Sequence, residues 1–327
     1  MDGNNNDPVW RPKVLDLDQV PGAFSFKEGF SRPNWQAIRQ AIGELVSPES
    51  TLDAWADASM QWVLQVREDL GGDYCVRGSK EFILLSELDD SAGQGLLDFV
   101  ERTLGQIYSV LGDAAWQWGG GKHVILLFSD NDDYDQYVSF FYGEGLHPIT
   151  GGCLIHKDYV HIAMPYGDGR SIRRALTHEL AHNSLVHLCL PLWLNEGIAV
   201  VFERTVSDSR RPFLDHELRD RHLAFWNPEN IQRFWSGVSW GEPGDLNELS
   251  YSLAEIVVNL LLAHKGEFGA FVKLAQRADA GQTAALDCLN RDLGEVMGTF
   301  LGEGNWRPQR KAMVECWKAA KWQMPKG

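Results

Sequence analysis

The chain has 327 residues, 44% of them hydrophobic, and a formal net charge of −15 at pH 7. This length and composition are enough for one large domain or two ordinary ones with a substantial core. The acidic balance argues against nucleic acid as a partner, because proteins that bind the phosphate backbone gather lysine and arginine on one face.

The N-terminal stretch MDGNNNDPVW has neither the basic nor the apolar region of a signal peptide. The apolar stretch at 256–263 is interrupted by Asn259 and falls short of the ~20 residues needed to span a bilayer. The five cysteines are odd in number and form no CxxC pair. We therefore expect a cytoplasmic protein with reduced thiols and no membrane segment.

The first half of the chain mixes helical and extended patterns. Residues 1 to about 33 contain four prolines and little periodicity, so we expect an irregular arm. Apolar spacing predicts a helix from Asn34 and a second from Ser50 to Leu70, which Gly71 and Gly72 end. Further along we expect extended structure at 74–87, a helix at 95–112, a buried strand at 123–129, a helix at 132–142 and a hairpin or edge strand at 153–164.

Beyond residue 190 nearly every segment has a helical pattern, and the 13 tryptophans are scattered as expected of core packing. The order of the expected strands and helices along the chain predicts an α+β fold. We expect a small mixed sheet whose edge strand packs on a central helix, followed by a mostly helical C-terminal half. We expect an N-terminal arm with helices at 1–70 and a second domain at 71–327. The second domain divides into an α/β part at 73–190 and a helical part at 191–327.

The central helix carries the most informative motif, ALTHELAHNSLVH at 175–187. His178 and His182 lie four residues apart, so both imidazoles can reach one ion from the same helical face. A catalytic zinc usually takes three protein ligands, so a third must lie nearby.

Glu196 fits as the third ligand. The first helix would continue about six residues past His182, or ~9 Å, and Glu196 lies about five residues, or ~7.5 Å, into a second helix that begins near Pro191. A sharp reversal at 188–190 brings Glu196 back to the level of the histidines. A glutamate among apolar helical neighbours also needs a partner, and a cation supplies one.

Glu179 points about a quarter turn away from His178, which suits an acid that contacts the metal-bound water and not the metal. A carboxylate there can take a proton from that water and pass it to a leaving amine. The pattern therefore predicts one Zn²⁺ per chain and hydrolysis of peptide bonds, although two imidazoles and a carboxylate also suit cobalt or iron.

HELAH and LWLNEG, with 13 residues between His182 and Glu196, resemble the gluzincin zinc metallopeptidases, particularly the aminopeptidase N-like and peptidase MA-like proteins. The resemblance covers roughly 73–275, and its specific part is 178–197. It implies a thermolysin-like catalytic domain with His178, His182 and Glu196 as zinc ligands and Glu179 as general base. It also implies that Tyr251, in SYSLAEIVVNLLLAHKG, stabilises the oxyanion.

The sequence departs from aminopeptidase N in two respects. The segment between the histidines and the glutamate is shorter, and the strand expected at 151–164 has no glutamate to bind a substrate's free amine. We therefore leave endopeptidase and aminopeptidase activity open, with a peptide or protein as the substrate, which would add as a strand to 151–164. The alternative function is a catalytically silent, zinc-binding scaffold, and the oligomeric state is open.

Other polar residues are weaker candidates. Asn183, Asn195 and Glu203 flank the ligands or share a face with Glu196 and are candidates for orienting them. The stretch DHELRDRH at 215–222 imitates the motif, but Asp220 replaces the second histidine, so we expect a solvated charged face. His187 lies off the face of His178 and is expected to be structural.

Overall fold

The computed structural model describes residues 12–115, 120–142, 151–206, 215–242 and 244–320. Contacts between residues divide the chain into two compact units. The first comprises the described parts of Met1–Glu101 and Gly119–Gly167, and the second those of Arg102–Trp118 and Asp168–Gly327. One boundary, between Glu101 and Arg102, lies within α3 (Asp90–Leu111), and another, between Gly167 and Asp168, lies directly before α5 (Gly169–Leu185).

The N-terminal arm is less irregular than expected. After a short 3-10 helix, η1 (Leu17–Gln19), β1 (Phe24–Lys27) pairs antiparallel with β2 (Phe30–Pro33). Glu28 and Gly29 join them, both with positive φ, which is the two-residue hairpin turn whose twist matches that of the strands. The expectation of an irregular arm was wrong here, and the signal was the Glu-Gly pair between FSF and FSR.

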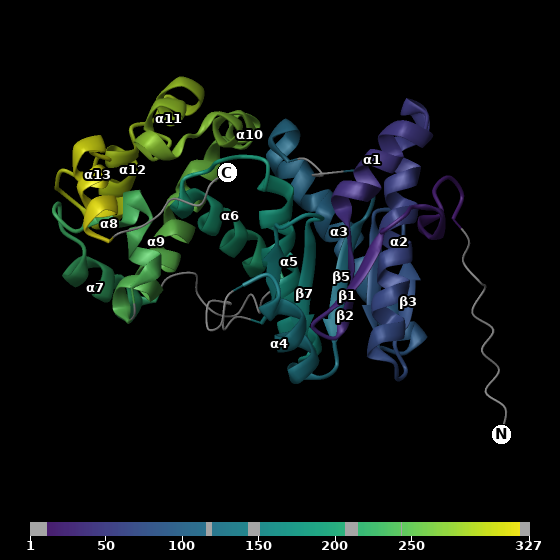
Figure 1. The fold of residues 1–327 in the computed structure, drawn as a ribbon. Helices are drawn as coiled ribbons and strands as arrows, with labels where there is room; N and C mark the ends of the chain where they lie inside the picture. The colour runs from purple at the N-terminus through teal and green to yellow at the C-terminus, as the bar shows by residue number, and fades with distance from the viewer. Residues whose placement is uncertain (1–11, 116–119, 143–150, 207–214, 243, 321–327) are drawn as a thin grey trace. The chain divides into compact units, whose positions relative to one another are not determined.

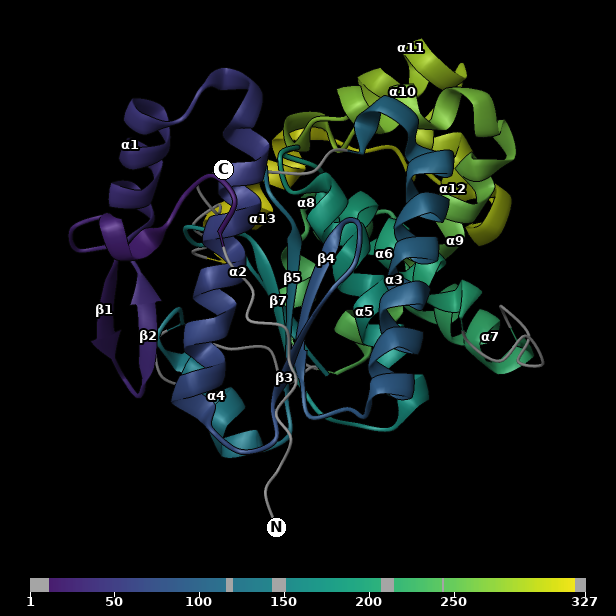
Figure 2. The ribbon, with the colours of Figure 1, turned by 90° about the vertical axis from the view of Figure 1, so that its right-hand side faces the viewer.

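The two predicted N-terminal helices are present as α1 (Trp35–Leu45) and α2 (Thr51–Leu70), with η2 (Pro48–Ser50) between them. Asn34 caps α1 by accepting a hydrogen bond from the Ala37 amide at 3.2 Å, and Gly71 ends α2. The β1–β2 hairpin lies beside α2 (Figure 2). Buried Asp57 on α2 fixes the arm, because one carboxylate oxygen accepts the amides of Lys13, Val14 and Leu15.

The first unit contains a five-stranded mixed sheet in the order β3-β4-β5-β7-β6. Its strands are β3 (Cys75–Gly78), β4 (Phe82–Ser86), β5 (His123–Phe128), β6 (Cys153–Ile155) and β7 (His161–Pro165). The three inner strands are parallel and fully buried apart from Pro165, which explains their continuous apolar runs. The predicted hairpin is present, since β6 pairs antiparallel with β7 and forms an edge of the sheet.

One face of this sheet shares a hydrophobic core with the N-terminal helices. Ile83, Leu85, Val124 and Leu126 pack with buried side chains of α1, α2 and α4 (Asn131–Ser139). The two units therefore do not divide at residue 70, where we expected a domain boundary, because α1 and α2 belong to the core of the sheet.

The sequence also predicts that a substrate adds as a strand at 151–164, beside the edge strand β6. This stays a prediction.

The second unit is helical in its described residues, so the α+β class and the helical C-terminal half are confirmed. After η3 (Gly112–Ala114) and α5 come α6 (Leu192–Thr205), α7 (His216–Phe225), α8 (Ile231–Ser236), η4 (Val238–Gly241), α9 (Asp245–Leu261), η5 (Leu262–His264), α10 (Lys265–Leu274), η6 (Arg277–Asp279), α11 (Gln282–Leu289), α12 (Leu293–Leu301) and α13 (Arg310–Ala319). Helix α6 packs against both α5 and α9 (Figure 1).

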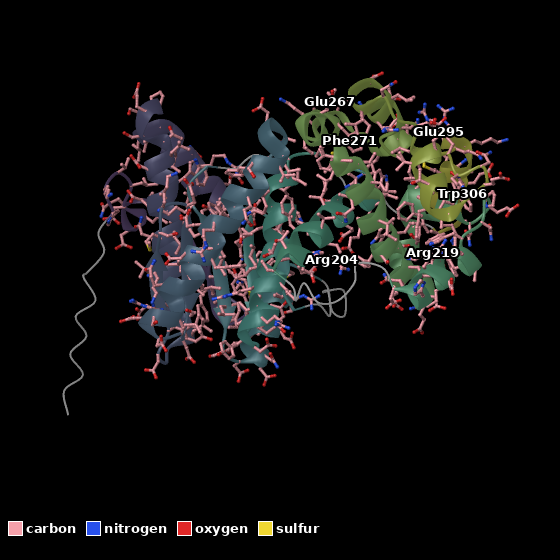
Figure 3. All side chains as sticks on the ribbon, turned by 180° about the vertical axis from the view of Figure 1, so that it is seen from behind. Arg204, Arg219, Glu267, Phe271, Glu295 and Trp306 are labelled. Atoms are coloured by element: carbon pink, nitrogen blue, oxygen red, sulfur yellow. The ribbon has the colours of Figure 1, made fainter. Side chains whose placement is uncertain are left out.

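Tryptophans link the helices of this unit through both burial and hydrogen bonds. The indole of buried Trp193 donates to the Ala280 carbonyl at 3.0 Å, and that of Trp235 donates to the carbonyl of Trp306, which is labelled in Figure 3, at 2.8 Å. These contacts agree with the expected packing role of the tryptophans. Among the described residues, no helix combines the length and the apolar character required to cross a bilayer.

Candidate metal centre

The motif helix α5 begins at a well-formed cap. Asp168 accepts hydrogen bonds from the amides of Arg170 at 3.0 Å and Ser171 at 3.1 Å, which satisfies two of the free donors at a helix start. Leu176 and Leu180 on the same helix are fully buried. His178 and His182 therefore lie on a fixed helix, with about 19% and 13% of their side chains exposed.

The connection to α6 reverses the chain earlier than expected. Helix α5 ends at Leu185, three residues after His182, and α6 starts at Leu192 after its cap residue Pro191. The chain turns directly after the helix, with the Leu188 amide donating to the Leu185 carbonyl at 2.9 Å. The expected length of the first helix was therefore wrong by about one turn, but the reversal still brings Glu196 to the histidines.

Three side-chain atoms form a compact triangle. The Nε2 atoms of His178 and His182 are 3.0 Å apart, and the Oε2 atom of Glu196 lies 3.5 Å and 3.6 Å from them, respectively. A tetrahedral ion with bonds of 2.0–2.1 Å places its ligand atoms about 3.3 Å apart. The three residues could therefore hold one metal ion, since their ligand atoms all lie within 4.8 Å of one another.

The electrostatics of the triangle also favour a cation. Burial would lower the pKa of His178, but hydrogen bonds to Glu196 and Glu203 raise it to about 10. Burial would likewise raise the pKa of Glu196, but the charge of His182 and the hydrogen bond from His178 lower it to about 2. A divalent cation on these three atoms would compensate the buried carboxylate and displace protons from the imidazole nitrogens.

Glu203 orients the first histidine. Its Oε2 atom lies 3.2 Å from Nδ1 of His178, on the opposite side of the ring from the triangle. Arg174, one helical turn before His178, donates from Nε to Oε1 of Glu203 at 2.9 Å and also forms an ion pair with it. A carboxylate on the second ring nitrogen fixes the tautomer and increases the basicity of a ligand histidine. Glu203 was one of three residues expected from the sequence to orient the ligands, whereas Arg174 was not expected, and its signal is the spacing of four residues before His178.

The two predicted catalytic residues lie close to the triangle. Glu179 is buried on α5, and its negative charge contributes to raising the pKa of His178, His182 and Tyr251. Tyr251 lies in the second turn of α9, where burial, followed by the charges of Glu196 and Glu179, raises the pKa of its phenol. The hydroxyl therefore keeps its proton at neutral pH and remains a hydrogen-bond donor.

The imitation motif at 215–222 contributes nothing to the triangle. It begins with Asp215, the cap of α7, and the helix that follows buries only His222 among its residues. His222 accepts a hydrogen bond at Nδ1 from the Trp226 indole at 3.0 Å, so its Nε2 faces Ser252 on α9 as a donor at 3.0 Å. The charged face is confirmed for the rest of α7, whereas His222 is a structural link that the sequence did not reveal.

The orienting roles of Asn183, buried on α5, and of Asn195, half-buried on α6, stay predictions. No protein-family model matches this sequence, and no curated protein matches it. The chemistry of the site is therefore the basis for inferring a function.

Proposed function

We propose that this protein is a zinc-dependent metallopeptidase with a gluzincin, thermolysin-like catalytic arrangement, acting on peptides or proteins. The proposal rests on the triangle of His178, His182 and Glu196, together with Glu179, which follows His178 directly on α5. A structural cluster of two histidines and a glutamate needs no further acid beside it, whereas hydrolysis needs a base.

Each residue has a distinct part in the reaction. A zinc ion on the three ligands would polarise the substrate carbonyl and lower the pKa of a coordinated water to about 7. Glu179 takes the proton of the attacking water on its carboxylate and passes it to the leaving amine. Tyr251 donates its phenolic hydrogen to the oxygen that becomes negative in the transition state.

Zinc is proposed over other metals because of the ligand set and the resemblance of HELAH and LWLNEG to the gluzincins. Cobalt or iron would accept the same donors. The surroundings of the ligands agree with a metal site, because the Glu203 carboxylate on His178 is the kind of support that ligand histidines usually have.

Glu179→Gln tests the catalytic proposal directly. The amide keeps the size of the side chain and removes its basicity, so we expect zinc content to stay at the wild-type level while peptide hydrolysis is lost. Glu217→Gln in the imitation motif on α7 is the matched control, because it makes the same change in an exposed helix.

The competing proposal is a zinc-binding scaffold without turnover. It predicts that zinc-loaded wild type and Glu179→Gln are equally inactive on a mixed peptide library. Hydrolysis by the wild type and by Glu217→Gln, with none by Glu179→Gln, excludes the scaffold.

A further inference from the structure

Helices α6 and α9 approach each other most closely beside the candidate metal ligand. Gly197 follows Glu196 directly and is buried against α9. A Cβ atom at this position would lie 2.7 Å from the Ala254 carbonyl oxygen and 2.7 Å from a methyl group of Val258. The two helix backbones are therefore in contact with no side chain between them.

The close approach is between backbone atoms, so no change of side-chain rotamer could make room for a side chain at position 197. The distance to the Ala254 oxygen falls about 0.7 Å short of the 3.4 Å at which ordinary contact begins. Ala254 is fully buried within α9, so its carbonyl cannot turn away without breaking the helix. Any side chain at 197 would have to separate the two helices.

The separation of these helices determines where Tyr251 lies. Tyr251 precedes Ala254 by three residues, or about 4.5 Å along the axis of α9. On α6, the ligand Glu196 is adjacent to the contact point. A change of spacing at Gly197 is therefore passed to the distance between Tyr251 and the metal ligands, because both helices are rigid over one turn.

An ion pair holds the same two helices together at a second point. Arg204, labelled in Figure 3, forms a two-point contact from α6 with Glu255 of α9, and its Nη2 atom lies 2.8 Å from Oε2. The Glu255 side chain is 4% exposed and that of Arg204 is 41% exposed, so the carboxylate end of this contact is shielded from solvent. The ion pair holds α6 and α9 together, and the missing side chain at Gly197 allows their backbones to approach closely.

We infer that Gly197 is a positioning residue, whose missing side chain sets the distance of Tyr251 from the metal ligands. This inference rests on the proposed function, because it gives Tyr251 the task of reaching a substrate on the metal. Gly197 itself contacts neither substrate nor metal, and its effect passes entirely through the spacing of α6 and α9.

Gly197→Ala is the test, with Gly105→Ala as its control. Gly105 lies on an exposed helical surface where an added Cβ meets nothing within 4 Å. For Gly197→Ala we expect one zinc per chain, an unchanged KM and a kcat lower by about 10- to 100-fold, because small misplacements of a catalytic group are costly. In a Tyr251→Phe background the same substitution should have little further effect.

A second readout does not depend on turnover. Protein labelled with 3-fluorotyrosine and loaded with Co²⁺ should show a paramagnetically displaced fluorine resonance for Tyr251, assigned by its loss in Tyr251→Phe. The displacement falls steeply with distance from the ion, so Gly197→Ala should reduce it and Gly105→Ala should not. If Gly197→Ala does not fold, the Gly197→Ala/Val258→Ala variant removes the methyl clash and keeps the Ala254 carbonyl in place.

The outcomes separate this inference from the proposed function. Metal-loaded Gly197→Ala with the wild-type displacement and kcat overturns the positioning role and leaves the metallopeptidase intact. A wild type that binds the ion, shows the Tyr251 displacement and hydrolyses no peptide overturns the proposed function and leaves the geometric relation standing. A wild type that takes up no metal overturns both.

Discussion

Replacing Glu203 with alanine should weaken zinc binding without removing any ligand. Glu203 accepts a hydrogen bond from His178 at 3.2 Å, and the two side chains are 20% and 19% exposed. A hydrogen bond to a charged group in such a partly buried place contributes about 1.5–3 kcal/mol. The distance is at the long end of the usual range, so we take the lower part of this interval, which corresponds to a 10- to 30-fold loss of zinc affinity.

The assay is competition for Zn²⁺ with a chromophoric chelator at pH 7.5. Glu203→Gln keeps an oxygen that can accept from His178 and should therefore lose less affinity than Glu203→Ala. Arg174→Gln leaves the carboxylate in place and should lose less still, because the arginine is 50% exposed. A Glu203→Ala variant whose zinc affinity stays within about threefold of wild type would refute the orienting role of this carboxylate.

Three further predictions concern catalysis and stability. Tyr251→Phe should lower kcat by about 100-fold with zinc content unchanged, measured with any cleaved peptide, and an unchanged kcat would exclude the oxyanion role. Asp57→Ala should destabilise the first unit by about 2–3 kcal/mol in urea unfolding, since three amides lose their acceptor, whereas exposed Asp53→Ala should have almost no effect. Burial lowers the pKa of His161 and of His222 to about 4, so both stay neutral when folded, while the unfolded chain takes up protons below about 6.5. Stability should therefore fall as the pH is lowered from 6.5 towards 4, and equal melting temperatures at pH 7 and pH 5 would contradict this.

Much of the fold could be predicted because it follows from local patterns. The apolar runs of β4 and β5 and the caps at Asn34 and Gly71 are local signals, and the corresponding elements are present in the structure. The β1–β2 hairpin was not predicted, because the prolines of the arm favour irregular structure and Glu28–Gly29 is a weaker turn signal than Asn-Gly or Asp-Gly. The grouping of α1 and α2 with the sheet depends on long-range packing, which periodicity does not report.

The candidate site was predictable to the extent that helical spacing determines it. His178 and His182 share a face by sequence alone, and the reversal before α6 brought Glu196 to the same level. Two other features depend on how the helices pack. They are the contact of Glu203 with Arg174 and the close approach of Gly197 to the Ala254 carbonyl. Such contacts between elements distant in the sequence leave no periodic signal in either one.

We propose that this chain binds one catalytic metal ion through His178, His182 and Glu196. The most direct test is elemental analysis of metal content per chain in wild type, His178→Ala and Glu196→Ala, each purified without chelator. We expect about one zinc per wild-type chain and its loss in both variants. A wild-type protein that contains no zinc, and takes up none when zinc is added, would contradict it.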